Sequence, residues 1–274
     1  MHAGACLNEG LSAFLTQPAP KPEFLRADQA AAFEDIDVAR SYRNRPGYAA
    51  AVFDTLIALM PGYGPILDIG CGTGFLARPL AERGFPVDAI DISPSMIEQG
   101  RAMPAGDLPH LRWQTVSFEE AVLVGPYALI VAGESLHWMD WPYVLPKCRD
   151  LLAPGGQLAI VDNRALPSPW QEELLPLIKS YSTLQGYTPY DTGRELTARG
   201  LFIEEGRIRI APDPMVQSIE EYIDSFHARA SLSRRAMGSR AVEFDEAVRA
   251  AIERTGARQV VIQRVTEIVW GTPR

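Results

Sequence analysis

The sequence lacks several features that would place it in a membrane or in an oxidising compartment. Its 274 residues contain no run of about 18 apolar residues, so no membrane-spanning helix is expected. The N-terminus has no basic stretch followed by an apolar one, which argues against a secretory signal. The three cysteines, Cys6, Cys71 and Cys148, are too few and too widely spaced for a disulfide framework or a zinc knuckle. These absences predict a protein of the reducing cytoplasm.

Positive charge is also in short supply. The chain has 26 Lys and Arg against 34 Asp and Glu, a formal net charge of −8. Binding to nucleic acid or to an anionic membrane requires clustered positive charge, so neither partner is expected. The one basic cluster comprises Arg229, Arg234, Arg235 and Arg240. A solvated helix end is the favoured interpretation, and recognition of an acidic substrate group or an RNA phosphate is the alternative. No close set of acidic side chains indicates a metal site.

The most informative stretch that is present is 65–77, Pro-Ile-Leu-Asp-Ile-Gly-Cys-Gly-Thr-Gly-Phe-Leu-Ala. A short apolar run predicts a buried parallel strand over 66–70. Glycines then alternate at positions where the backbone must take positive φ or approach a ligand closely. A helical pattern over 74–83 follows. Strand, glycine loop and helix together indicate the nucleotide-binding turn of a doubly wound sheet.

Strands and helices continue to alternate up to Asp162. Further strands are predicted at 87–91, 111–116, 127–132 and 157–162, with helices at 94–103 and 141–152. This alternation is typical of βαβ units and predicts an α/β fold, a mostly parallel sheet with helices on both faces.

After Asp162 the alternation breaks. Helices are predicted over 167–186, 192–199, 219–230 and 244–255, and strands over 202–210 and 259–270. We therefore divide the chain into a flexible arm (1–27), an N-terminal helical lid segment (28–60), a cofactor-binding core (61–163) and a second half of the sheet with helical substrate-cap insertions (164–274).

Two nucleotide cofactors could use the glycine loop. Gly72-Thr-Gly74-Phe-Leu-Ala77 satisfies the dinucleotide pattern G-x-G-x-x-G/A, which alone is a weak signal for NAD. Asp68 argues against NAD, because a carboxylate at this place repels a pyrophosphate and favours a ligand with cationic groups. S-adenosylmethionine carries an ammonium and a sulfonium group and no phosphate. Asp91 ends the second predicted strand and suits the ribose hydroxyls of either cofactor.

The stretch Ile66–Ala77 resembles motif I of the class I S-adenosylmethionine-dependent methyltransferases, in its form L-D-I-G-C-G-T-G. The resemblance extends from about Tyr42 to Asn163. Leu136-His137-Trp138-Met139-Asp140 resembles the L-H-W-x-D signature of a type 11-like subgroup that acts on small molecules. Residues 42–48, Tyr-Arg-Asn-Arg-Pro-Gly-Tyr, resemble the Y-x-x-x-R-P-x-Y motif of that subgroup with one residue fewer between Tyr and Arg. The resemblance implies a seven-stranded Rossmann-like methyltransferase fold whose last strand is antiparallel.

The resemblance also implies roles for individual residues. Asp68 and the Gly70–Gly74 backbone, including Cys71, would hold the methionine end, Asp91 would bind the ribose, and Ile92 and Met96 would pack on the adenine. Ser117 stands where many members have an Asp that contacts the adenine, and Phe118 would offer its backbone N–H. Gly133 would line the methionyl amine, and Tyr42 and Arg45 would close over the cofactor, with Arg45 pairing the cofactor carboxylate.

Transfer of a methyl group requires mainly that the acceptor is positioned close to the donor. His137 is the candidate general base, and a histidine that only shapes the pocket is the alternative. The acceptor pocket is predicted to include Glu134, Trp138, Trp170, Tyr181 and Phe226. Glu134 could instead pair with Arg45 or Arg164, and the aromatic residues of the insertions could instead fix the cap to the sheet.

The sequence thus predicts an S-adenosylmethionine-dependent methyltransferase of a small molecule, a monomer or homodimer, with oxygen favoured as the acceptor atom and nitrogen or carbon left open. The alternatives are an RNA or protein methyltransferase, a non-catalytic or non-methylating S-adenosylmethionine-binding protein, and an NAD-dependent oxidoreductase.

Overall fold

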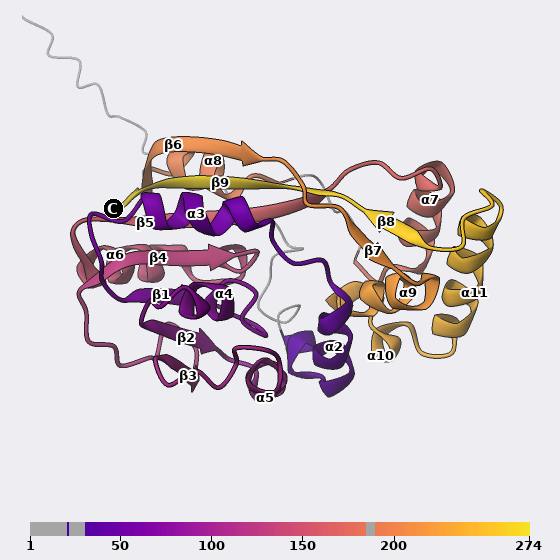
Figure 1. Ribbon diagram of the computed structural model, residues 1–274, viewed down its shortest axis with the longest axis horizontal. Helices are drawn as coiled ribbons and strands as arrows, with labels where there is room; N and C mark the ends of the chain where they lie inside the picture. The colour runs from indigo at the N-terminus through magenta and orange to yellow at the C-terminus, as the bar shows by residue number, and fades with distance from the viewer. Residues whose placement is uncertain (1–20, 22–30, 185–189) are drawn as a thin grey trace, which may run out of the picture.

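A seven-stranded sheet forms the centre of the protein. The computed structural model describes residue 21 and residues 31–184 and 190–274, so the predicted arm over 1–27 lies outside the described residues except for Lys21. The strands of the main sheet are β1 (Ile66–Ile69), β2 (Val87–Asp91), β3 (Leu111–Thr115), β4 (Tyr127–Gly133), β5 (Leu152–Ala165), β6 (Phe202–Ile210) and β9 (Arg264–Pro273). They lie side by side in the order β3-β2-β1-β4-β5-β9-β6 (Figure 1).

The strand directions agree with the sequence prediction. Strands β3, β2, β1, β4 and β5 pair in parallel. The last strand, β9, is antiparallel to both of its neighbours, β5 and β6. The predicted α/β fold, with a doubly wound, mostly parallel sheet of seven strands, is therefore confirmed.

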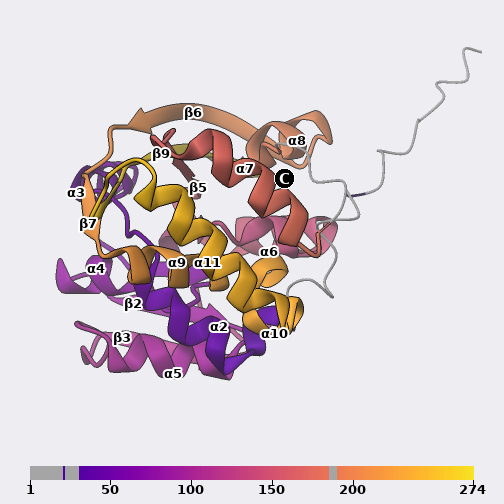
Figure 2. The ribbon, with the colours of Figure 1, turned by 90° about the vertical axis from the view of Figure 1, so that its right-hand side faces the viewer.

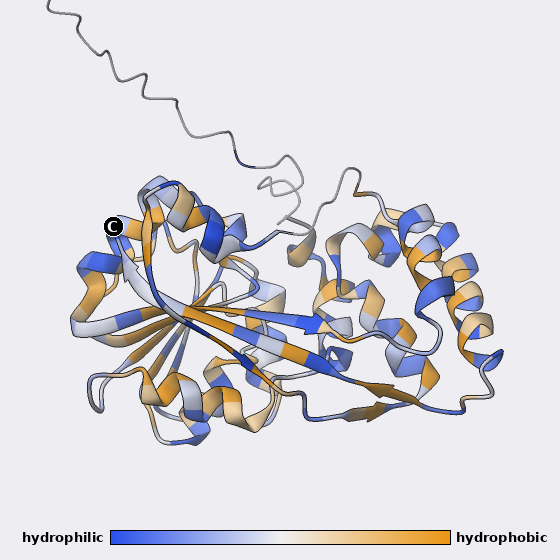
Figure 3. Ribbon diagram, turned by 90° about the horizontal axis from the view of Figure 1, so that it is seen from above, coloured by the Kyte–Doolittle hydropathy of each residue, from blue (hydrophilic) through white to orange (hydrophobic). Residues whose placement is uncertain are grey.

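Helices cover both faces of this sheet. Helices α3 (Ala50–Ala58), α4 (Ala77–Glu82) and α5 (Pro94–Ala102) contribute apolar side chains to one face. Helices α6 (Trp141–Leu151) and α8 (Thr192–Ala198) contribute to the other. All four residues of β1 are buried, because each face of this strand contacts a helical layer. Hydrophobic residues accordingly dominate the central strands, while the surrounding helices have hydrophobic and hydrophilic faces (Figure 3).

A second helical body lies at one end of the sheet (Figures 1 and 2). It comprises α7 (Gln171–Tyr181), α9 (Ile219–His227), the 3-10 helix η5 (Ala230–Leu232), α10 (Arg234–Met237), α11 (Arg240–Glu253) and the paired strands β7 (Met215–Gln217) and β8 (Val260–Ile262). We call this body the cap. It has its own apolar core, in which Phe244 is fully buried. Because the cap core is separate from the cores on the two sheet faces, the two bodies can be perturbed independently.

The predicted lid segment 28–60 divides into two parts. The 3-10 helix η2 (Ala31–Glu34), helix α2 (Ile36–Ser41) and the 3-10 helix η3 (Tyr42–Asn44) lie between the sheet and the cap. There Ser41 and Asn44 donate hydrogen bonds to Asp224 of α9. Helix α3 instead packs on the sheet, with Val52 and Leu56 fully buried. Only the first part is therefore placed to cover a site.

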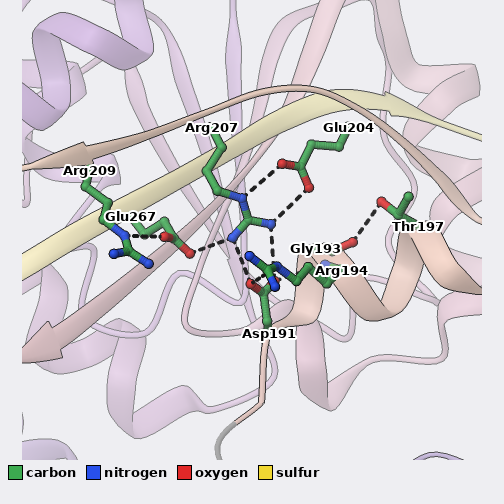
Figure 4. A network of polar contacts seen from close by, with 8 residues as sticks. All are labelled: Asp191, Gly193, Arg194, Thr197, Glu204, Arg207, Arg209 and Glu267. Atoms are coloured by element: carbon green, nitrogen blue, oxygen red, sulfur yellow. Dashed lines mark hydrogen bonds and ion pairs between the residues drawn. The ribbon is translucent and has the colours of Figure 1, made fainter.

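A charged network fixes helix α8 to the sheet edge (Figure 4). Arg207 on β6 donates hydrogen bonds to Asp191, Glu204 and Glu267. Arg209 donates to Glu267 at 2.7 Å. Asp191 also caps α8 by accepting from the backbone N–H of Arg194. Since Glu267 lies on β9, the network connects α8, β6 and β9.

Candidate functional site

A cavity of about 340 Å³ lies at the carboxyl ends of β1, β2 and β4, the edge at which doubly wound sheets bind ligands. We call it the donor cavity. It is lined by twelve of the thirteen residues that the sequence assigned to the cofactor. These are Tyr42, Arg45, Asp68, Gly70, Cys71, Gly72, Asp91, Ile92, Met96, Ser117, Phe118 and Gly133. The structure thus brings together residues from five separate segments of the chain.

The exception is Gly74, and its position explains why. A Cβ atom at Gly74 would lie 2.5 Å from the Trp113 ring, so this glycine is required by packing inside the protein. Gly72 differs, because a Cβ there would meet only Tyr42, at 3.8 Å. Gly72 has a φ of +55° and borders the donor cavity. At Gly72 the backbone can therefore approach a ligand closely.

Two carboxylates line the donor cavity beside the glycine loop. Asp68 is buried, and one of its oxygens accepts a hydrogen bond from the N–H of Ala77 at 3.0 Å. The pKa of Asp68 is raised to about 8, mainly by burial, which outweighs the lowering effect of the Ala77 hydrogen bond and is assisted by the charge of Asp91. Asp91 accepts from the N–H of Gly72 at 2.7 Å and of Ser93 at 2.8 Å. Burial raises the pKa of Asp91 as well. The cavity therefore favours a ligand that carries positive charge.

Apolar side chains also line the donor cavity and suit a flat ring. Met96 is buried and Ile92 is about half exposed, and both border the cavity. The hydroxyl of Ser117 donates to the Glu120 carboxylate and accepts from the Glu120 N–H, both at 3.2 Å. It therefore stabilises its own turn. A contact from Ser117 to the adenine remains a prediction.

A charged cluster closes the donor cavity on the side of the cap. Arg45 donates to the Tyr42 hydroxyl at 2.9 Å and to Glu134 at 2.8 Å. Glu134 has a φ of +51°, a strained conformation for a residue with a side chain. Burial alone would raise the pKa of Glu134, but Arg45 and Arg264 bring it below its usual value. Glu134 is therefore ionised at neutral pH.

A second cavity of about 420 Å³ lies between the sheet and the cap and shares Arg45 and Pro46 with the donor cavity. We call it the cap cavity. Its walls include Trp170 and Phe226, two of the predicted acceptor-pocket residues. Glu134 and Trp138, also predicted for that pocket, line the donor cavity instead. The two cavities adjoin at Arg45.

Comparison with known proteins identifies the part of the chain that carries the donor cavity. Residues 66–156 match the model of a methyltransferase domain family. These residues form a class I methyltransferase domain. An uncharacterized methyltransferase of Mycobacterium tuberculosis is 33% identical over 122 residues, which are 44% of this chain and 48% of the relative. A ubiquinone biosynthesis O-methyltransferase of Xanthomonas axonopodis is 33% identical over 113 residues, 40% of this chain and 47% of the relative.

The chain spans about half the length of these curated relatives. A structure assigned as a type II methyltransferase from Anaeromyxobacter dehalogenans has a TM-score of 0.58 and 24% identity. The superposition covers 84% of this chain and 99% of the chain of that structure. This similarity extends beyond the residues that match the family model. It shows that the two proteins share a fold.

S-adenosylmethionine is the cofactor of this methyltransferase domain, and the residues of the donor cavity fit it. The ionised form of Asp68 would face the methionyl ammonium group, and Asp91 would accept from the ribose hydroxyls. Met96 and Ile92 would enclose the adenine. The cofactor supplies an activated methyl group on a positively charged sulfur. A buried carboxylate with a raised pKa gains most from a cationic partner, so Asp68 is suited to this ligand.

The sequence prediction missed several residues that line the two cavities, among them Tyr48, Asn163 and Arg264. Tyr48 and Asn163 line the donor cavity, and Arg264 lines the cap cavity. Arg264 lies 3.7 Å from Glu134 and donates to the carbonyl oxygen of Asn163 at 2.7 Å. It comes from β9, whose antiparallel register places Arg264 opposite Ala165. The sequence signal was an arginine that interrupts the apolar run of the last strand.

The predicted general base lies outside both cavities. His137 is on the 3-10 helix η4 (Leu136–Trp138), its ring contacts the Trp138 ring at 4.6 Å, and it is absent from the lining of either cavity. Burial lowers the pKa of His137 to about 4, although Glu134 raises it. His137 is therefore neutral at pH 7 and a weak base. Its catalytic role stays a prediction.

The sequence prediction also included Tyr181 and a basic cluster. Tyr181 packs edge-on against Phe244 in the cap and lines neither cavity, so its position matches the alternative that it fixes the cap. The basic cluster is dispersed. Arg234 pairs with Asp224, and Arg240 donates to the carbonyl oxygen of Ser180. Only Arg229 of that cluster lines a cavity.

In the part of the chain that the structure describes, no group of acidic, histidine or cysteine side chains is arranged to hold a metal ion. None of the helices described there is both long enough and apolar enough to cross a bilayer.

Proposed function

We propose that the protein transfers a methyl group from S-adenosylmethionine to a small molecule, with oxygen favoured as the acceptor atom. One observation carries this proposal: the donor cavity contains two carboxylates, Asp68 and Asp91, at the ends of adjacent parallel strands beside an open glycine. A cationic methionyl end of S-adenosylmethionine would stabilise the ionised form of Asp68, whereas a pyrophosphate would be unfavourable beside Asp91 and would oppose ionisation of Asp68. This arrangement therefore favours the methyltransferase over an NAD-dependent enzyme.

The size of the second cavity supports a small acceptor. A volume of about 420 Å³ lies within the range of small-molecule sites. The acceptor would enter between the sheet and the cap and meet the donor at Arg45, which borders both cavities. An RNA or protein acceptor would need an open surface for recognition. The cap therefore supports a metabolite as the acceptor.

The chain's contribution to the reaction is mainly orientation. The glycine loop and the two carboxylates would fix the donor, and the cap cavity would hold the acceptor in line with the bond that breaks. Such positioning can supply about 7–11 kcal/mol of the barrier reduction. An acceptor that ionises before binding requires no base from the protein.

Calorimetry with S-adenosylmethionine, S-adenosylhomocysteine and NAD tests the donor half of this proposal. We expect both sulfur compounds to bind and NAD not to bind. Binding of NAD without any response to S-adenosylhomocysteine would overturn the proposal. A mass increase of one methyl group in a metabolite extract, dependent on S-adenosylmethionine, tests the transfer itself. Its absence would favour a non-methylating or non-catalytic protein.

The role of His137 is tested by His137→Ala once an acceptor is known. General base catalysis contributes about 10²–10⁴-fold to a rate. We expect a loss below about tenfold, because His137 is absent from the lining of the donor cavity. A loss of a hundredfold or more would establish it as the base. The predicted cytoplasmic location and the predicted monomeric or homodimeric state stay predictions.

A further inference from the structure

The junction of the two cavities carries an excess of positive charge. Arg45, Arg229 and Arg264 all lie near Glu134, whose pKa each of them lowers. Arg45 is held by Tyr42 and by Glu134. One carboxylate therefore faces three guanidinium groups. The side chains of Arg45 and Arg264 are largely buried, so an anion bound beside them would offset the cost of their excess positive charge.

Arg229 is the member of this group without a partner. Among the described residues it makes no ion pair and no side-chain hydrogen bond, and its guanidinium lies over the Phe226 ring at 5.0 Å from the centroid. Arg229 is exposed, and its side chain borders the cap cavity. A guanidinium group stays protonated at neutral pH, so Arg229 faces the cavity as a cation.

Arg264 contributes a second unused donor. Its terminal nitrogen donates to the carbonyl oxygen of Asn163, but its Nε is buried and has no hydrogen-bond partner among the described residues. Buried donors are almost always paired in folded proteins. Arg229 and Arg264 line the same cavity. Guanidinium groups with free donors at one cavity are well suited to hold a carboxylate or a phosphate.

Apolar side chains line one part of the cap cavity, among them Trp170, Leu174, Ile178, Tyr222, Phe226 and Val260. Ser168, Gln171, Ser225 and Gln263 contribute polar groups to the rest of its wall. The apolar side chains come from α7, α9 and β8, the elements of the cap. A ligand that fills this cavity would place an apolar body between the cap helices and a charged group against the two arginines.

We propose that Arg229 and Arg264 bind an oxyanion group, a carboxylate or a phosphate, of an acceptor whose apolar body occupies the cap cavity. The proposed oxyanion site defines the chemical class of the acceptor. It rests on the proposed methyl transfer. Arg45 belongs to the donor side, and Arg229 and Arg264 belong to the acceptor side. The acceptor is thus an amphipathic anion.

Calorimetry with three probes of equal chain length tests this assignment. The probes are octanoate, octyl phosphate and the neutral octanamide, each titrated with and without saturating S-adenosylhomocysteine. We expect at least one of the two anions to bind at least tenfold more tightly than octanamide. Tighter binding of octanoate identifies a carboxylate as the group recognised, and tighter binding of octyl phosphate identifies a phosphate. Equal binding of octanamide, or no binding of either anion at millimolar concentration, would overturn the proposal.

Variants then assign the effect to the residue. Arg229→Ala should weaken binding of the preferred anion at least tenfold and leave octanamide unchanged, and Arg229→Lys should restore part of the loss. The matched control is Arg235→Ala, because Arg235 is 85% exposed and lines neither cavity. Unchanged anion binding by Arg229→Ala would overturn the assignment.

Affinity for S-adenosylhomocysteine reports separately on the donor cavity and on the fold. It should be unaffected by all three substitutions. If S-adenosylhomocysteine does not bind to the wild type while the anion probes do, the proposed methyl transfer fails and the anion site stands.

Discussion

The donor cavity and the cap cavity differ in how the chain builds them. The donor cavity is lined largely by short segments at the ends of three strands that are neighbours in the sheet, β2, β1 and β4, within residues 66–156. The cap cavity is assembled from α7, α9, β8 and the start of β9, which are widely separated in the sequence. The donor cavity is acidic beside the glycine loop, and the cap cavity contains Arg229, which has no ion pair among the residues that the structure describes. A local motif can encode the first, whereas only the tertiary fold creates the second.

The largest expected effect comes from emptying the cap core. Phe244→Ala removes a fully buried ring and should lower the free energy of unfolding by about 3–5 kcal/mol. Because the sheet has its own cores, the Kd for S-adenosylhomocysteine should change less than about twofold. Urea unfolding and calorimetry measure the two quantities. Leu67→Ala, in the buried strand β1, is the matched control and should lower stability and weaken cofactor binding together.

If Phe244→Ala weakened cofactor binding more than tenfold, the donor cavity would depend on the cap, and the comparison between two separate regions would be wrong.

A smaller effect should distinguish two glycines of one loop. Gly74→Ala places a Cβ 2.5 Å from Trp113 at a φ of +78°, so it should cost about 3 kcal/mol of stability. Gly72→Ala meets no atom nearer than 3.8 Å, so it should cost about 1 kcal/mol from its positive φ. The Kd for S-adenosylhomocysteine, measured on the folded fraction of each variant, should nevertheless rise more in Gly72→Ala than in Gly74→Ala. The opposite ranking of stabilities would contradict the packing role of Gly74.

The charge of Asp68 provides a third test. Asp68→Asn keeps the size of the side chain and an acceptor for the Ala77 N–H, but it removes the carboxylate that would pair with the methionyl ammonium. A hydrogen bond to a charged group contributes about 1.5–3 kcal/mol, so the Kd should rise about ten- to a hundredfold. Circular dichroism should show that the fold is retained. An unchanged Kd would show that Asp68 serves only to hold the start of α4.

The smallest effect concerns pH. The raised pKa of Asp68, about 8, means that the free protein holds a proton at neutral pH. A cationic ligand favours the ionised form, so binding releases that proton, and affinity should increase as the pH rises from 6 to 7.5. The Kd for S-adenosylmethionine should therefore fall several-fold over this range. Asp68→Asn should abolish most of the dependence. A Kd that increases with pH would have the wrong sign for this account.

Much of the fold could be predicted from the sequence, because strand and helix patterns within the methyltransferase domain are local. The observed bounds of β2 and β6 equal the predicted ones. Strand β5 is longer than predicted, since Leu152–Gly156 belongs to it despite a Pro-Gly-Gly turn signal. The short strand β7 was missed, because its three residues form a strand only by pairing with β8.

The residues of the site also divide into those that the sequence predicts and those that only the fold reveals. Residues such as Asp68 and Gly72 were predictable because adjacent parallel strands place their ends at one edge of the sheet. Arg264 was not, because its position depends on the register of an antiparallel strand that returns from the cap. Arg229 was predicted to be solvated, and it is exposed, but a sequence cannot show that it also borders a cavity beyond the end of α9.

The most direct test of the central claim is a crystal structure of the complex with S-adenosylhomocysteine. The ligand should occupy the donor cavity, with its ribose hydroxyls against Asp91 and its amino group on the side of Asp68. The cap cavity and Arg229 should remain free for the acceptor. A ligand whose nucleoside lies between Trp170 and Phe226, or whose ribose makes no contact with Asp91, would contradict the account.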